Sequence, residues 1–170
     1  MSHDIQIYVA DLAAYNAGYL HGVWIDATLS TDDIQNEIQA MLAKSPVSDA
    51  EEYAIHDYEG FEGVSLSEWE GLDSVHQMAN FIEEHGALAA GLINHFDDVD
   101  TAIKAIDDGY HGCYESLADY AQQVTEDCTT IPQHLQYYID YESMARDWDM
   151  SGDIFTIELV HDELHVFSNI

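Results

Sequence analysis

The first third of the chain combines runs of β-prone residues with one helical pattern. IQIYVA (5–10) and VWIDA (23–27) are rich in β-branched and aromatic residues, and the turn-rich stretch YNAGYLHG separates them. STDDIQNEIQAMLAK (30–44) places its apolar residues on one helical stripe, with a serine or threonine at its start that can cap the helix. EEYAIHDYE (51–59) has the composition of a third strand. We therefore expect an antiparallel β-sheet and one helix in this part.

Helical spacing dominates the middle of the chain. Apolar residues from Val75 to Ile82 recur at intervals of three and four, and Gly86 stands where a helix-ending glycine is favoured. Two shorter apolar stripes follow, one beginning at Leu88 and the other at Val99. These patterns predict three successive helices.

The last third begins with a helical stripe that starts at Leu117 and ends in two β-prone runs, IFTIELV and LHVF. A turn at 161–163 separates the two runs, so the pattern predicts a terminal β-hairpin. The chain as a whole is typical of an α+β fold with three small subdomains: an N-terminal antiparallel β-sheet plus helix (1–60), a helical middle (61–107) and a C-terminal α+β part with a β-hairpin (108–170).

The charge changes this picture of an ordinary α+β protein. The chain has 34 acidic residues, only 3 basic residues and a formal net charge of -31. The three parts carry net charges of -10, -9 and -12, so the acids are spread along the chain and do not form a tail. With 47% hydrophobic and 11% aromatic residues, the chain has enough apolar side chains to fold. A surface of this kind repels nucleic acids and anionic membranes and attracts basic proteins or multivalent cations.

The cysteines and the chain ends indicate a compartment. Cys113 and Cys128 are too few for a disulfide framework and lack CxxC spacing, so reduced thiols are expected, as in the cytosol. No apolar run approaches the ~18 residues of a membrane span, and the N-terminus lacks the basic and apolar segments of a signal peptide. We expect a soluble, cytoplasmic protein.

One stretch, DWDMSGDIFTIE (147–158), has the ligand spacing of an EF-hand calcium loop. A helix should follow such a loop, whereas its closing glutamate lies in the β-prone run IFTIELV. We therefore interpret DWDMSGD as an acidic turn and IFTIE as the start of a strand. An acidic calcium-binding protein is the alternative, and its ligands would be Asp147, Asp149, Ser151, Asp153 and Glu158.

Sequence motifs of catalysis are missing. HDELH (161–165) departs from the HExxH pattern of zinc proteases, lies at the expected hairpin turn, and is not C-terminal as a retention signal must be. The sequence has no GxSxG, no phosphate-binding loop, no dinucleotide fingerprint and no Cys–His constellation. The ten histidines, surrounded by carboxylates, are typical of surface groups. We expect no enzymatic activity, no cofactor and no metal site.

The amount of charge points to a possible use for a folded polyanion. B-DNA carries one negative charge per about 1.7 Å of axis, so 31 net charges match roughly 53 Å, or about 15–16 base pairs. An elongated fold with this charge would attract a protein that has a long basic groove. The alternative is a halophile-adapted soluble binding protein, which also carries much surface acid and little lysine. Composition alone does not separate the two.

Local patterns resemble the ArdA-type antirestriction proteins, DNA mimics carried on mobile genetic elements. IQIYVADLAAYNAGYLHGVWIDA is similar to the opening strand, Tyr-Asn-x-Gly loop and Gly-x-Trp strand of that family, and EEYAIHDYEGF is similar to its acidic segment. GLINHFDDVDTAIKAI lies where the family has its antirestriction motif. LQYYIDYESMARDWDMSG resembles a further family segment, with Trp148 in place of the usual aliphatic residue.

The resemblance implies an elongated, curved chain of three subdomains that forms a homodimer and imitates bent B-form DNA. It also implies that the protein inhibits type I restriction–modification enzymes by occupying the DNA-binding groove of their methyltransferase and specificity core. Neither a nucleic acid nor a membrane is an expected partner. Within residues 97–127 we expect nine acids to belong to the mimic surface, each replaceable on its own: Asp97, Asp98, Asp100, Asp107, Asp108, Glu115, Asp119, Glu126 and Asp127.

Overall fold

The computed structural model describes residues 4–169, which fold into two compact units. The first unit ends at Val99 and the second begins at Asp100. Both units contain helices and a small antiparallel β-sheet, and the predicted α+β class is therefore confirmed. No helix in residues 4–169 has the length and apolar character needed to cross a membrane.

The sheet of the first unit consists of three antiparallel strands in the order β2-β1-β3. These are β1 (Gln6–Asp11), β2 (Gly22–Asp26) and β3 (Tyr53–Glu59), as the β-prone runs predicted. The central strand β1 buries Ile7 and Val9 completely, because alternate side chains of a strand point to the same face. The β-prone runs of the N-terminal third therefore identified its strands correctly.

A short helix between the first two strands was not predicted. The stretch expected to be only a turn-rich loop begins with α1 (Leu12–Asn16), which is capped at its N-terminus by Asp11. The Ala14 backbone N–H donates to Asp11 Oδ1 at 3.1 Å. A helix of five residues is too short to show a periodic apolar stripe, so this side-chain cap is its main signal in the sequence.

Three longer helices complete the first unit, and all three were predicted. They are α2 (Thr31–Ala43), α3 (Leu72–His85) and α4 (Ala87–Phe96). Ser30 caps α2 by accepting the Asp33 N–H, as expected for one of the two candidate residues. Gly86 separates α3 from α4 with a φ of 60°, a conformation that glycine adopts at little cost.

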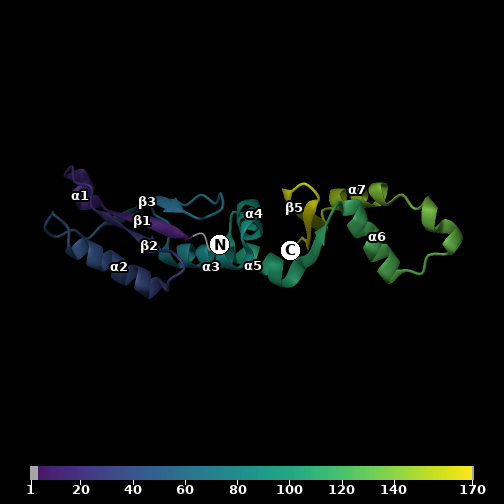
Figure 1. Cartoon of the computed structure of the whole chain (residues 1–170), viewed down its shortest axis with the longest axis horizontal. Coiled ribbons are helices and arrows are strands. Elements are labelled where there is room, and N and C mark those ends of the chain that lie inside the picture. The colour runs from purple at the N-terminus through teal and green to yellow at the C-terminus, as the bar shows by residue number, and fades with distance from the viewer. Residues whose placement is uncertain (1–3, 170) are drawn as a thin grey trace. The chain divides into compact units, whose positions relative to one another are not determined.

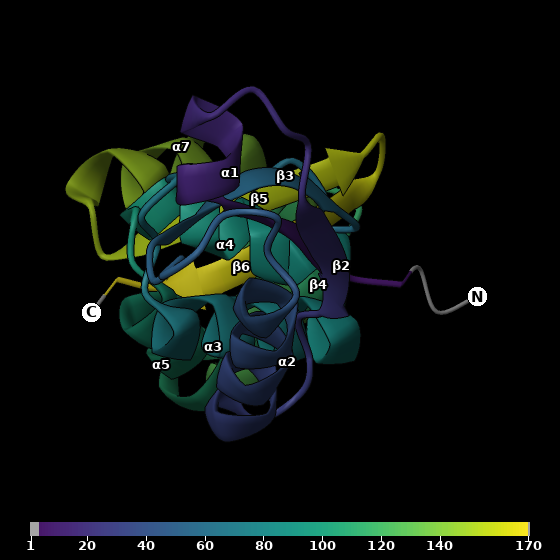
Figure 2. The ribbon, with the colours of Figure 1, turned by 90° about the vertical axis from the view of Figure 1, so that its left-hand side faces the viewer.

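The helices α2 and α3 lie on one face of the β2-β1-β3 sheet (Figures 1 and 2). Side chains of α3 bind the segment that leads into α2. The Asn80 amide donates to the Thr28 carbonyl at 3.1 Å, and a nitrogen of His76 lies 2.6 Å from the Leu29 carbonyl. The core of this unit therefore lies between the sheet and α2 and continues to α3, which packs against α2.

The second unit contains the rest of the secondary structure. Its sheet has the order β4-β6-β5, with all neighbours antiparallel, and β5 and β6 form the predicted terminal hairpin. Val166 and Phe167 of β6 are fully buried and form the centre of its core. The elements are α5 (Val99–Gly109), β4 (Tyr110–Tyr114), α6 (Leu117–Cys128), the 3₁₀ helix η1 (Gln133–Tyr138), α7 (Tyr141–Ser151), β5 (Ile154–Val160) and β6 (Glu163–Ser168).

Two features of the second unit correct the sequence analysis. Strand β4 was not predicted, because its five residues contain Gly112 at a φ of 112° and the pairing register shifts there. The stretch DWDMSGD was expected to be a turn, but its first five residues are the end of α7. Burial of Ala145 and the edge-on contact of Trp148 with Tyr120, at 6.0 Å between ring centroids, hold this end against α6. Gly152 then ends the helix with a φ of 79°.

Candidate functional site

The acidic side chains form the surface of both units. Of the 34 acids, all but three are exposed; Asp11 is buried, and Glu70 and Glu163 are intermediate. The first unit contains 19 acids and one basic residue, and the second contains 15 acids and two basic residues. Their net charges are therefore -18 and -13, which together give the -31 of the whole chain. Both units therefore carry a large negative charge.

The first of the acids predicted within residues 97–127 lie at the ends of two helices. Asp97 caps the C-terminus of α4 in a left-handed conformation, and Asp98 follows it in the first unit. Asp100 lies in the first turn of α5, and Asp107 lies seven residues later in its last turns. Seven residues correspond to two helical turns and about 10.5 Å of helix axis, so these two carboxylates share a face.

A second pair of acids repeats this spacing on α6. The helix begins after Ser116, whose hydroxyl oxygen accepts the Asp119 N–H at 3.2 Å. Glu126 lies seven residues after Asp119, again about 10.5 Å along the axis, and accepts a hydrogen bond from the Gln122 amide at 3.0 Å. All nine predicted acids are exposed, and the remaining three lie beside these groups: Asp108 in α5, Glu115 before α6 and Asp127 in α6.

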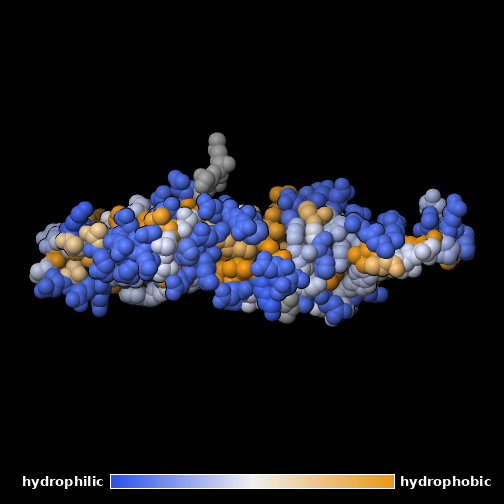
Figure 3. All heavy atoms as spheres, turned by 90° about the horizontal axis from the view of Figure 1, so that it is seen from below, coloured by the Kyte–Doolittle hydropathy of each residue, from blue (hydrophilic) through white to orange (hydrophobic). Residues whose placement is uncertain are grey.

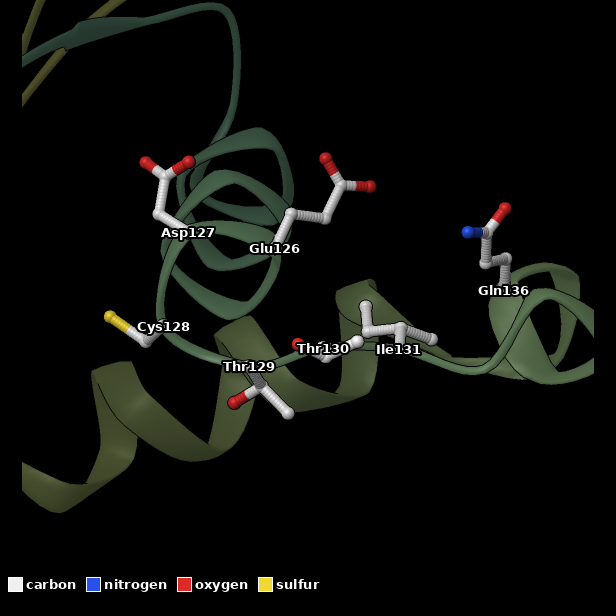
Figure 4. A pocket seen from close by; sticks show the side chains of 7 residues that line it. All are labelled: Glu126, Asp127, Cys128, Thr129, Thr130, Ile131 and Gln136. Carbon is white, nitrogen blue, oxygen red and sulfur yellow. The ribbon is translucent and has the colours of Figure 1, made fainter.

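The C-terminal end of α6 borders a hollow of about 570 Å³. Figure 4 shows the carboxylates of Glu126 and Asp127 projecting from the helix, with Gln136 of η1 across from Glu126. The lining is mostly polar, whereas sites for small organic ligands are typically lined by apolar and aromatic side chains. The hollow therefore presents charge at an open surface.

Hydrogen bonding keeps one further acid of this unit ionised. The Ser143 backbone N–H donates to Asp140 Oδ1 at 3.0 Å, and the Ser143 hydroxyl donates to Oδ2 at 2.8 Å. These bonds lower the pKa of Asp140 below its ordinary value of 3.8, and the positive charge of Arg146 acts in the same direction. Asp140 thus caps α7 as a carboxylate and adds to the negative surface.

Apolar side chains interrupt the acidic surface. On the face drawn in Figure 3, hydrophilic residues predominate and smaller apolar areas lie among them. In the second unit, Tyr137 and Tyr138 of η1 are 93% and 84% exposed, and Leu135 beside them is also exposed. Exposed aromatic rings of this kind are enriched where proteins bind other proteins.

The proposed calcium ligands do not form an EF-hand loop. Asp147, Asp149 and Ser151 lie in α7, where residues two apart point about 200° away from one another. Asp153 lies in the connection between α7 and β5. Glu158 lies in β5, so the strand predicted for IFTIE is confirmed. The Ser151 hydroxyl donates to Asp153 Oδ2 at 3.0 Å, so these two side chains bind one another. The arrangement does not provide the alternating oxygen ligands that the loop requires.

The structure also brings together three potential ligands that the sequence analysis did not group. A ligand atom of each of Cys113, Glu163 and His165 lies within 4.8 Å of the other two. The sequence shows no Cys–His motif, and strand pairing brings these residues together although they are far apart in the chain. The sequence signal was hidden because the pairing of β4 with β6 joins residues 52 positions apart, and β4 itself was not predicted.

The fold and the surface define the class of this protein: it is a polyanionic α+β protein with acidic side chains exposed on both units. Comparison with known proteins gives the family. Residues 7–162 match the family model of the antirestriction protein ArdA, so the chain belongs to the ArdA antirestriction family, and the resemblance found in the sequence is confirmed. Comparison with individually curated proteins gave no match.

Proposed function

We propose that this protein inhibits type I restriction–modification enzymes by imitating B-form DNA and occupying the DNA-binding groove of the methyltransferase and specificity core. The observation that carries the proposal is the exposure of nearly every acid on a folded scaffold, in both units. Membership of the antirestriction family supplies the biological context. The proposed mechanism needs no reaction and no cofactor, because binding alone excludes the substrate DNA.

The amount of charge supports this proposal quantitatively. At one charge per about 1.7 Å, the -18 of the first unit matches roughly 31 Å of duplex, or about nine base pairs. The -13 of the second unit matches roughly 22 Å, or about six base pairs. A homodimer, which we also propose, doubles both figures and thus presents a length of charge suited to an extended basic groove.

The positions of the acids support it as well. Paired acids on α5 and α6 lie about 10.5 Å apart along each helix axis, close to the axial length of three base-pair steps at about 3.4 Å each. No single carboxylate needs to replace a particular phosphate. Long-range attraction depends on the summed charge, whereas the affinity of the docked complex also depends on which charges face the groove. Association should therefore be fast and sensitive to salt.

A competition experiment tests the proposal. A fluorescent duplex that contains the recognition sequence is first bound to a type I methyltransferase, and the acidic protein is then added at increasing concentration. We expect complete displacement of the duplex at low ionic strength and weaker displacement as salt rises. No displacement at low salt by folded protein would contradict the proposal.

A parallel measurement separates mimicry from halophilic adaptation. Thermal unfolding of the protein alone is followed from low to concentrated salt. A protein adapted to high salt needs concentrated salt to fold, because self-repulsion among its acids must be screened. We expect a folded protein at low salt, with a modest rise in Tm as salt increases.

A further inference from the structure

The sheet of the second unit carries a compact group of potential metal ligands. Cys113 of β4 and His165 of β6 are directly opposite one another in the antiparallel register, and Glu163 precedes His165 by two residues. All three side chains therefore lie on one face of the sheet. A nitrogen of His165 already lies 3.3 Å from Glu163 Oε1, and the thiol and these two groups lie within 4.8 Å of one another.

The histidine of this group is held in place by a neighbouring tyrosine. The Tyr110 hydroxyl lies 2.7 Å from His165 Nδ1, and the two rings stack with centroids 5.8 Å apart. The register shift between Tyr110 and Gly112 places Tyr110 opposite Phe167, from where its hydroxyl reaches back to the imidazole. His165 is only 8% exposed, so its ring has little freedom to turn away.

We propose that Cys113, Glu163 and His165 bind a zinc ion, with water as the fourth ligand. Thiolate, imidazole and carboxylate are the three ligand types that Zn²⁺ uses in proteins, whereas Ca²⁺ and Mg²⁺ prefer oxygen alone. With metal–ligand bonds of about 2.0–2.3 Å, ligand atoms in a tetrahedral site lie roughly 3.3–3.8 Å apart. The Glu163–His165 pair is already at this separation, and the ligand atom of the exposed Cys113 lies within 4.8 Å of both.

Proton balance at this site follows from the hydrogen bond to Tyr110. The bound form needs the lone pair of His165 Nε2, so the imidazole carries its proton on Nδ1 and donates it to the Tyr110 oxygen. The Cys113 thiol loses its proton to solvent when it becomes a ligand. Each zinc ion bound near neutral pH therefore releases about one proton from the thiol.

The position of the site indicates what it does for the protein. It links β4 to β6, and β4 connects α5 to α6, the two helices that carry most of the acids predicted within residues 97–127. A metal link between these strands stabilises the folded form by mass action. The inference rests on strand register and ligand geometry in the second unit and does not depend on the proposed function.

The test uses Co²⁺ as a spectroscopic substitute for Zn²⁺ on the full-length, reduced protein. We expect a saturable one-site titration with sulfur-to-cobalt charge-transfer absorption, reversed by stoichiometric Zn²⁺. Cys113→Ser should abolish the charge-transfer band. The matched control Cys128→Ser, which alters the other exposed free thiol, should leave the titration unchanged. A band that survives Cys113→Ser, or several weak sites without sulfur absorption, would show diffuse binding of cations to a polyanion and overturn the proposal.

Two further variants test the role of the imidazole. Tyr110→Phe removes only the hydroxyl that orients His165, and we expect about a 10–100-fold loss of Zn²⁺ affinity. His161→Gln changes an exposed histidine of the same hairpin and should leave affinity unchanged. Circular dichroism of each variant reports whether it folds. Equal affinity of folded Tyr110→Phe and wild-type protein would contradict the assigned geometry.

Discussion

Neutralising six acids of the second unit tests the mimic surface without altering side-chain size. Each of six exposed acids is replaced by the amide of the same shape (Asp→Asn, Glu→Gln): Asp107, Asp108, Glu115, Asp119, Glu126 and Asp127. They lower the net charge of this unit from -13 to -7. Because self-repulsion falls, the variant should fold at least as well as the wild type at low salt.

The expected loss of affinity follows from the exposure of these groups. An exposed charge pair is worth about 0.2–1 kcal/mol, so six independent losses sum to about 1–6 kcal/mol, or roughly 10- to 10⁴-fold in the inhibitor's dissociation constant. A single change should cost only about 1.4- to 5-fold. The assay is displacement of duplex DNA from a type I methyltransferase at low ionic strength.

A control with the same net charge tests whether position matters. Six exposed acids of the first unit are converted to their amides, which gives this variant the same total charge as the first: Glu51, Glu52, Asp57, Glu59, Glu62 and Glu68. We expect the second-unit variant to lose more affinity than this control. Equal losses would refute the assignment of residues 97–127, and no loss in either variant would refute charge mimicry itself.

Three further predictions concern individual residues. Asp11 is fully buried and caps α1, so Asp11→Ala should lower the free energy of unfolding by about 1–2 kcal/mol, while Asp11→Asn should retain the wild-type value in urea denaturation. An equal loss in both would show that the charge, not the cap, matters. Phe167 is fully buried against Phe155 and Tyr110, at 5.1 and 4.9 Å between ring centroids. Phe167→Ala should therefore cost about 3–5 kcal/mol, and an unchanged Tm would contradict this core. Burial, with the nearby Cys113 and Glu163, raises the pKa of Tyr110 above 10.0. The stability from its protonated form is full below pH 10 and is lost as pH rises through the folded pKa. The free energy of unfolding should therefore fall less steeply above pH 10 in Tyr110→Phe than in the wild type, and an equal fall would contradict the raised pKa.

Elements that bury a wide apolar face were predictable from the chain. The stripes of α2 and α3 contain at least four buried residues each, and both strands of the terminal hairpin are rich in β-branched and aromatic residues. In such elements the spacing of apolar residues is set by the geometry of burial, so it is visible in the sequence. The β-prone run IFTIELV also correctly indicated a strand at Glu158, where an EF-hand would need a helix.

Elements stabilised by local or long-range contacts were not predictable in this way. Helix α1 depends on one cap, and β4 depends on pairing with β6 across a glycine. The end of α7 is held by the contact of Trp148 with α6, although its composition is typical of a turn. The exposure of the acids was predictable from the net charge of the chain. The proximity of Cys113 and His165 was not, because it depends on the pairing register of β4 and β6.

The most direct test of the account is whether the protein and DNA exclude one another from the same enzyme. The dissociation constant of the protein for a type I methyltransferase is measured at fixed ionic strength with increasing concentrations of duplex that contains the recognition sequence. If both occupy one groove, the apparent constant rises in direct proportion to free duplex once the duplex exceeds its own dissociation constant. A constant that reaches a plateau, or does not change, would place the two ligands at separate sites and contradict DNA mimicry.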